Sequence, residues 1–259
     1  MFSPRRLRGL ALFLVLGAMT VAVSLQSAGA ALQLGGAARN VLIGKDNDNA
    51  SNTFIQPAGI AAKQHLDNTD LLRGGNRGDL LIGLKGGDLL DGAPGNDVLV
   101  GGVEQAQAPN SDLIDGDYGD DVNVWAPGDG SDAFVGSRGY DTHISAPIVL
   151  AGSAPALFST GYRQVPHVSI DSKPQFTCTV EAVPAAEQLG FRYVTRFLAN
   201  GRLAVTIRLQ DVEQVLCPSP NPGRVLVARV RGSNPTFVER PLSYFSGSLV
   251  GAIIQATQR

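Results

Sequence analysis

Short apolar runs recur through the middle of the chain at intervals of nine residues. Each run follows an aspartate and ends at a glycine, as in Asp79-Leu80-Leu81-Ile82-Gly83 and Asp97-Val98-Leu99-Val100-Gly101. Short runs between turn residues are typical of β-strands, and a fixed period indicates units that stack on one another. The pattern therefore predicts many short strands arranged in regular coils.

Eight such units lie between residues 65 and 145 when they are aligned on the acid in their sixth place. These acids are Asp70, Asp79, Asp88, Asp97, Asp112, Asp121, Asp132 and Asp141. The apolar residue two places after the acid is expected to point into one narrow core. In six units this residue is Leu72, Leu81, Leu90, Leu99, Ile114 or Phe134.

Glycines occupy the turn positions of most units, where they permit tight or left-handed backbone conformations. They include Gly83, Gly86, Gly92, Gly95, Gly116, Gly119, Gly136 and Gly139. Turns of this kind allow backbone carbonyl groups to converge.

The unit resembles the G-G-x-G-x-D-x-U-x nonapeptide of RTX-type (hemolysin-type) calcium-binding proteins. The resemblance covers about a third of the chain. It implies a parallel β-roll in which Ca²⁺ is held between turns, with the eight aspartates and the turn glycines named above as the metal site.

The spacing gives the same expectation a physical basis. If two units form one coil, the acids form two stacks, one of Asp70, Asp88, Asp112 and Asp132 and the other of Asp79, Asp97, Asp121 and Asp141. Stacked strands lie ~4.8 Å apart, and two charges at that distance repel by ~4 kcal/mol at an effective dielectric constant near 20. Ca²⁺ bound to carboxylates and carbonyls removes this repulsion, whereas Mg²⁺ demands a tighter octahedron.

The two stacks leave room for about six calcium ions. At extracellular calcium concentrations these ions would stabilise the roll by roughly 8 kcal/mol, which is as much as the whole stability of an ordinary domain. Calcium is therefore expected to decide whether the roll is folded.

Several units depart from the pattern. Residues 103–108 form an insertion, and Trp125-Ala126 adds two residues before the next acid, so we expect bulges at both places. Asn123 and His143 replace the apolar residue, which predicts a looser core toward the end of the array.

The segment before the array predicts export and capping. Residues 1–30 have a basic start, an apolar centre and an Ala28-Gly29-Ala30 cleavage site, which is typical of a signal peptide and indicates a secreted protein. Export by the general or the twin-arginine route stays open. Residues 31–64 contain degenerate repeats, Asn40 to Gly44 and Asn52 to Ile55, expected to cap the roll.

Residues 146–259 lose the nonapeptide period and predict a small, mainly antiparallel β domain. Expected strands are 176–181, 191–199, 202–209, 225–230 and 242–254. Asn200-Gly201 predicts a two-residue hairpin turn. Cys178 and Cys217 are the only cysteines, and in an exported protein such a pair is expected to form a disulfide bond.

Charge and motifs narrow the function. Residues 65–145 carry 15 acidic and 4 basic side chains, which disfavours nucleic acid and suits a metal ion. The sequence has no H-E-x-x-H or G-x-S-x-G motif, and it predicts neither a catalytic site nor a membrane span after signal removal.

The expected function is that of a secreted, non-enzymatic, calcium-binding all-β protein. One alternative is a calcium-stiffened adhesion protein whose C-terminal domain binds a cell-surface or envelope ligand. An extracellular enzyme acting on polysaccharide is least favoured.

Overall fold

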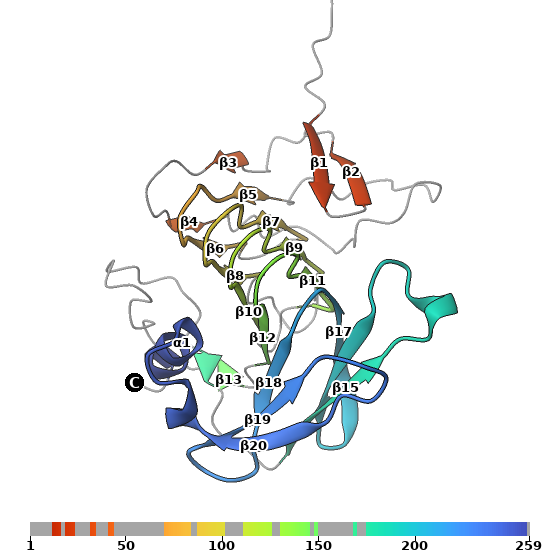
Figure 1. Cartoon of the computed structure of the whole chain (residues 1–259), viewed down its shortest axis with the longest axis vertical. Coiled ribbons are helices and arrows are strands. Elements are labelled where there is room, and N and C mark those ends of the chain that lie inside the picture. The colour runs from red at the N-terminus through yellow and green to blue at the C-terminus, as the bar shows by residue number, and fades with distance from the viewer. Residues whose placement is uncertain are drawn as a thin grey trace, which may run out of the picture.

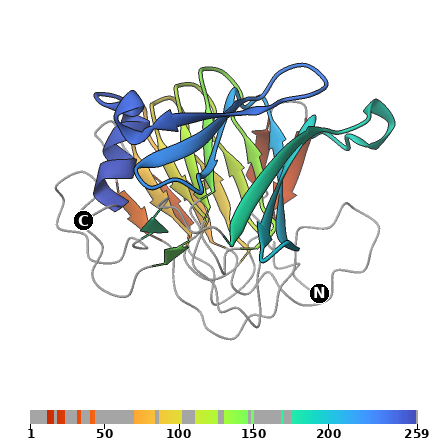
Figure 2. The ribbon, with the colours of Figure 1, turned by 90° about the horizontal axis from the view of Figure 1, so that it is seen from below.

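The computed structural model describes residues 70–83, 87–101, 111–125, 130–145 and 175–257, and six short strands outside these ranges. The fold is all-β, as predicted, with parallel strands stacked in a roll (Figure 1). Two eight-stranded sheets make up the roll and its C-terminal extension, and Figure 2 shows them side by side along the direction of stacking.

Each coil of the roll contributes one strand to each sheet. One sheet contains β3 (Leu32–Leu34), β5 (Leu71–Arg73), β7 (Leu89–Asp91), β9 (Leu113–Asp115) and β11 (Ala133–Val135). The other contains β4 (Val41–Ile43), β6 (Leu80–Ile82), β8 (Val98–Val100), β10 (Val122–Trp125) and β12 (Thr142–Ser145). Leu71 lies opposite Leu89, and Leu89 opposite Leu113, so one coil consists of two units, as expected.

The predicted core is confirmed. All six apolar residues in the eighth place of their units belong to one buried cluster between the sheets. The outward-facing residues of the second sheet, such as Leu80 and Val98, are buried in another cluster. Strands β6 and β8 are therefore apolar on both faces, which is typical of parallel sheets.

The expectation of a loose core at Asn123 and His143 is wrong, because both side chains are buried and hydrogen-bonded to each other. Of the bulge expected at Trp125-Ala126, only Trp125 lies within the described residues. Trp125 extends β10, is buried, and donates its indole N–H to the carbonyl of Gly130. Residues 103–108, Ala126 and Asn52 to Ile55 lie outside the described residues.

The C-terminal strands continue both sheets of the roll. β15 (Phe176–Ala182), β16 (Tyr193–Ala199) and β17 (Arg202–Gln210) are antiparallel to one another, and β17 pairs in parallel with β11. In the other sheet, β18 (Gln214–Pro218) pairs in parallel with β12 and is followed by β19 (Arg224–Arg229) and β20 (Phe237–Pro241). The degenerate repeat at 40–44 likewise adds β4 beside β6.

Four of the five strands expected in the C-terminal region are present, and Asn200 and Gly201 both have positive φ, as the hairpin prediction requires. The strand expected at 242–254 is wrong. This segment forms the 3₁₀ helix η2 (Leu242–Phe245) and the helix α1 (Leu249–Thr257). Val250, Ile253 and Ile254 lie at helical spacing and are buried in the same cluster as Leu80 and Val98. Ala252, on the other side of the helix, is exposed. One amphipathic face therefore stabilises a helix despite the β-branched residues.

The remaining elements are short. They are β1 (Leu12–Leu16) and β2 (Met19–Val23), which are antiparallel, β13 (Ile148–Val149) and β14 (Val168–Ser169), and the 3₁₀ helix η1 (Ala185–Glu187). Among the described residues, no helix combines the length and apolar character needed to cross a membrane.

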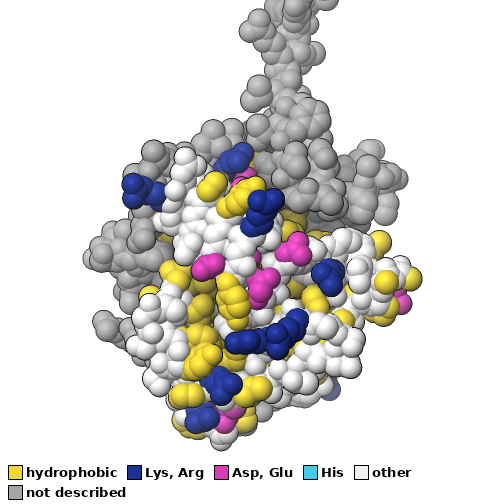
Figure 3. All heavy atoms as spheres, in the orientation of Figure 1, with side chains coloured by type: hydrophobic (Ala, Val, Ile, Leu, Met, Phe, Trp, Pro, Cys, Tyr) yellow, Lys and Arg dark blue, Asp and Glu magenta, His cyan; other side chains and the backbone are white. Residues whose placement is uncertain are grey.

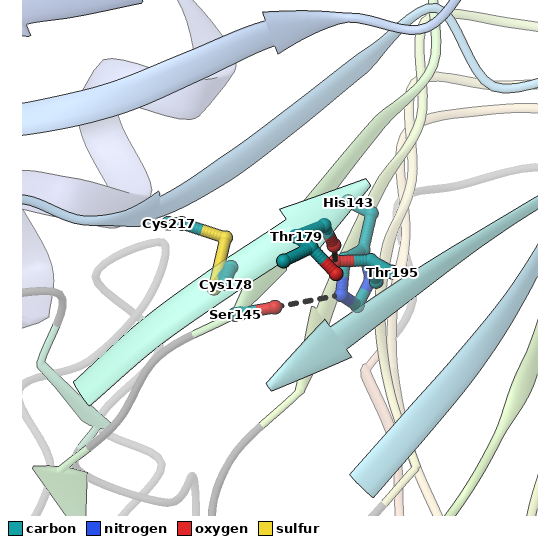
Figure 4. The surroundings of a disulfide bond; sticks show 6 residues. All are labelled: His143, Ser145, Cys178, Thr179, Thr195 and Cys217. Atoms are coloured by element: carbon teal, nitrogen blue, oxygen red, sulfur yellow. Dashed lines mark hydrogen bonds between the residues drawn. A yellow bond between two sulfur atoms is a disulfide. The ribbon is translucent and has the colours of Figure 1, made fainter. Parts of the chain in front are cut away.

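The predicted disulfide bond is present between Cys178 and Cys217. It joins β15 of one sheet to β18 of the other, close to the last coil of the roll (Figure 4). Closing a loop of 39 residues stabilises the fold by about 4 kcal/mol through the lost chain entropy of the unfolded state.

Candidate metal centre

The eight repeat aspartates form two continuous ladders inside the turns of the roll. All eight are at most 1% exposed, and each stands immediately before a strand. In each ladder, the backbone N–H of every acid but the last donates to Oδ1 of the acid one coil further on. In the first ladder the N–O distances are 2.8 Å from Asp70 to Asp88, 2.7 Å from Asp88 to Asp112 and 3.0 Å from Asp112 to Asp132.

The second ladder repeats this geometry. Its N–O distances are 2.6 Å from Asp79 to Asp97, 2.7 Å from Asp97 to Asp121 and 2.9 Å from Asp121 to Asp141. The two stacks expected from the spacing are therefore both present, although insertions separate some of their members in the sequence.

Glu213 extends the second ladder by one step, which the sequence interpretation missed. The N–H of Asp141 donates to Glu213 Oε2 at 2.8 Å. Glu213 stands directly before β18, and the apolar Val215 follows two places later, as in a repeat unit. The preceding turn is only Asp211-Val212, so the nine-residue spacing is lost. In the sequence, only the acid-x-apolar pattern from Glu213 to Val215 could have indicated that Glu213 joins the ladder.

Burial leaves carboxylate oxygens in the second ladder without hydrogen bonds. Oδ2 of Asp97, Asp121 and Asp141 is buried and accepts no hydrogen bond from the described residues. Desolvation raises the pKa of Asp97 and of Asp141 to about 8 and that of Asp121 to about 9. Neighbouring carboxylates contribute to these raised pKa values, because like charges disfavour the ionised form. The second ladder therefore holds negative charge at a high energetic cost.

In several turns, the glycine that directly follows a strand lies close to both a carbonyl oxygen and such a carboxylate. A Cβ atom added to Gly92 would lie 2.6 Å from Asp97 Oδ2 and 2.8 Å from the carbonyl oxygen of Gly116. A Cβ on Gly136 would lie 2.5 Å from Asp141 Oδ2 and 2.1 Å from the carbonyl oxygen of Asp211. Only glycine lets the backbone approach this pair of oxygens.

The other predicted glycines also lie where a side chain would collide with a neighbouring carboxylate or carbonyl group. Gly83 and Gly116 also face an aspartate Oδ2, at 2.4 Å from the added Cβ in each case. Gly119 and Gly139 have φ of +144° and +148° and pack against the carbonyls of Gly95 and Gly119. A Cβ on Gly95 would lie 2.7 Å from the carbonyl oxygen of Arg77. Gly86 lies outside the described residues.

The turns that hold the second ladder carry further acids. Asp91 and Asp115 end strands β7 and β9, lie opposite each other, and are almost fully buried. Desolvation raises the pKa of Asp115 to about 6, although the hydroxyl of Ser137 donates a hydrogen bond to its Oδ1 at 3.0 Å. Asp91 is paired with Arg73 at 3.3 Å. These acids place further buried carboxyl groups beside the second ladder.

These atoms suit a hard divalent cation. The donors are carboxylate and carbonyl oxygens, which Ca²⁺ prefers, and neither histidine nor cysteine contributes. Within the described part of the chain, no three acidic, histidine or cysteine side chains converge on one point. A bound ion therefore needs turn carbonyls as well as one Oδ2 per acid, and the glycine turns place both kinds of oxygen together.

No family model, curated protein or solved structure matches the chain. Function is therefore inferred from the chain's own residues.

A second polar group lies in the core beside the disulfide bond (Figure 4). His143 Nε2 is 3.1 Å from Ser145 Oγ, and His143 Nδ1 is 2.6 Å from Asn123 Oδ1. This order of groups is that of a hydrolase triad, but all three side chains are at most 1% exposed. Burial lowers the pKa of His143 to about 3, which keeps the ring neutral. In this arrangement no substrate can reach Ser145, and the group packs the last coil.

Proposed function

We propose that the chain is a calcium-binding protein whose β-roll closes when Ca²⁺ lies between its stacked turns. The observation that carries this proposal is the second ladder, in which buried carboxylate oxygens at Asp97, Asp121 and Asp141 accept no hydrogen bond from the described residues. Ions here would neutralise the ladder and complete its coordination. The nonapeptide pattern of RTX-type proteins supports the same interpretation, and a predicted signal peptide places the protein where calcium is plentiful.

Carboxylate repulsion and the free energy of calcium binding both favour the calcium-bound roll over the metal-free roll. Adjacent carboxylates repel by about 4 kcal/mol at an effective dielectric constant near 20, and desolvation adds to that cost. Each occupied site stabilises the folded state by about 1.4 kcal/mol when calcium exceeds its dissociation constant tenfold. Glu213 adds a fourth gap to the second ladder, so the roll would hold about six or seven ions.

Calorimetric titration of the metal-free protein with CaCl₂ tests the proposal. We expect uptake of about six or seven ions with dissociation constants of about 0.1–1 mM. A parallel titration with MgCl₂ is expected to show binding at least about tenfold weaker, because the turns supply many oxygens but no compact octahedron. Absence of calcium uptake, or equal affinity for both ions, would refute the assignment.

A further inference from the structure

Three arginines line a pocket on the outer face of β18, β19 and β20. The pocket has a volume of about 290 Å³ and includes Arg229, Arg231 and Arg240. Within the described residues, no carboxylate forms an ion pair with any of them. The acid next to Arg240, Glu239, is instead held by Arg224 at 2.7 Å and by Asn221 at 2.8 Å. The pocket therefore presents positive charge that no described carboxylate compensates, and the Arg240 guanidinium lies over the Tyr244 ring, 5.4 Å from its centre.

A second hollow of about 690 Å³ adjoins this pocket, and the two share Gln214 and Tyr244. Its floor is formed by β10 and β12, and its wall by η2 and the start of α1, including Ser248 and Leu249. The two hollows, together called the groove below, lie next to each other on the outer face of one sheet, from Asn96 and Asp120 in the turns of the roll to the three arginines. In Figure 3, Lys/Arg and hydrophobic side chains lie together over β19 and β20, below acidic side chains over the turns of the roll.

The remainder of the groove is polar and carries exposed tyrosine rings. Tyr140 is 42% exposed and Tyr244 is 55% exposed. Asn96, Asp120 and Thr142 supply hydrogen-bonding groups along the same groove. Tyrosine offers an apolar ring together with a polar hydroxyl, and this combination matches the mixed faces of sugar rings.

We propose that this groove binds an acidic polysaccharide, with a carboxylate or sulfate group among Arg229, Arg231 and Arg240. A guanidinium group binds such oxyanions through two parallel hydrogen bonds. An elongated, hydroxyl-rich chain fits a groove of this length and polarity. A flat anionic membrane would not reach the recessed floor of the groove. The arginine pocket contains none of the ladder acids, and its proposed function goes beyond calcium binding.

Binding of short, fluorescently labelled oligosaccharides to the full chain in calcium buffer tests this proposal. The probes are an oligouronate, a sulfated oligosaccharide and a neutral oligosaccharide of equal length, with anionic phospholipid vesicles as a fourth. We expect at least one acidic oligosaccharide to bind at least about tenfold more tightly than the neutral one. Preference for the vesicles, or absence of any preference for acidic sugars, would overturn the proposal.

Substitution of the arginines locates the site. Arg229→Gln combined with Arg231→Gln is expected to weaken acidic oligosaccharide binding about tenfold or more, and Arg240→Gln alone is expected to weaken it less. Arg202→Gln is the matched control, because Arg202 is an exposed arginine on the other sheet. All four side chains are exposed, so the variants are expected to keep the circular dichroism of the parent. Equal loss of binding in the control, or no loss in the pocket variants, would contradict the assignment.

Discussion

Acidifying the calcium-free protein from about pH 8 to about pH 4.5 is expected to increase its β-structure, because the buried acids become neutral. The folded-state pKa values of Asp97, Asp121 and Asp141 are about 8 to 9, above the ordinary aspartate pKa of 3.8. The folded roll therefore binds more protons than the unfolded chain between these limits. Its stability is greatest near or below pH 3.8 and falls as pH rises through 8 to 9.

One buried group acts in the opposite direction. The depressed pKa of His143, about 3, means that protonation of the unfolded chain below pH 6.5 destabilises the fold. Three carboxyl groups whose pKa values are raised to about 8 or 9 outweigh this one imidazole. Far-UV circular dichroism of metal-free protein across this pH range measures the balance. In saturating calcium the trend is expected to reverse, because protons displace the ion. Equal order at pH 8 with and without calcium would contradict the prediction.

Gly119→Ala is expected to destabilise the roll by about 3 kcal/mol or more. Gly119 has φ of +144°, and an added Cβ would lie 1.3 Å from the carbonyl oxygen of Gly95 in the previous coil. The obstacle is backbone, so two coils would have to separate. Denaturant unfolding in calcium measures the loss.

The control for this substitution is Gly190→Ala. Gly190 also has positive φ, at +94°, but nothing lies within 4 Å of the added Cβ. We expect a loss of only about 1–2 kcal/mol from backbone strain. Similar losses in the two variants would show that coil stacking does not depend on the close approach at Gly119.

The roll could be predicted from sequence because its information is local and repeated. Acid, apolar residue and glycine recur in phase, so the pairing of Asp97 with Asp121 follows from counting units even across the insertion between them. The same counting assigned Leu72 and Phe134 to the core correctly. Every unit packs against its neighbours through the same surface. The packing of one pair of stacked units therefore describes the whole array.

The junction with the C-terminal strands was not predictable in this way. Glu213 joins the ladder 72 residues after Asp141, through a turn without glycine. Strands β18 and β20 carry charged or proline residues that obscure their pattern. Residues 249–257 form a helix because the outer face of the sheet accepts an apolar stripe, and composition alone favoured a strand. Asn123 and His143 occupy core positions because each satisfies the other's hydrogen bonds.

Calcium titration of Asp121→Asn, followed by far-UV circular dichroism at about pH 8, tests most directly whether the buried acids both oppose closure and bind the ion. The amide keeps the Oδ1 acceptor for the N–H of Asp97 but removes the charge. Asp120→Asn is the control, because Asp120 is the adjacent acid, is exposed, and likewise accepts one backbone hydrogen bond, from Tyr140. We predict that Asp121→Asn is more ordered than the parent without calcium and needs more calcium for full order, whereas Asp120→Asn behaves as the parent does. An Asp121→Asn titration identical to that of the parent would contradict the account.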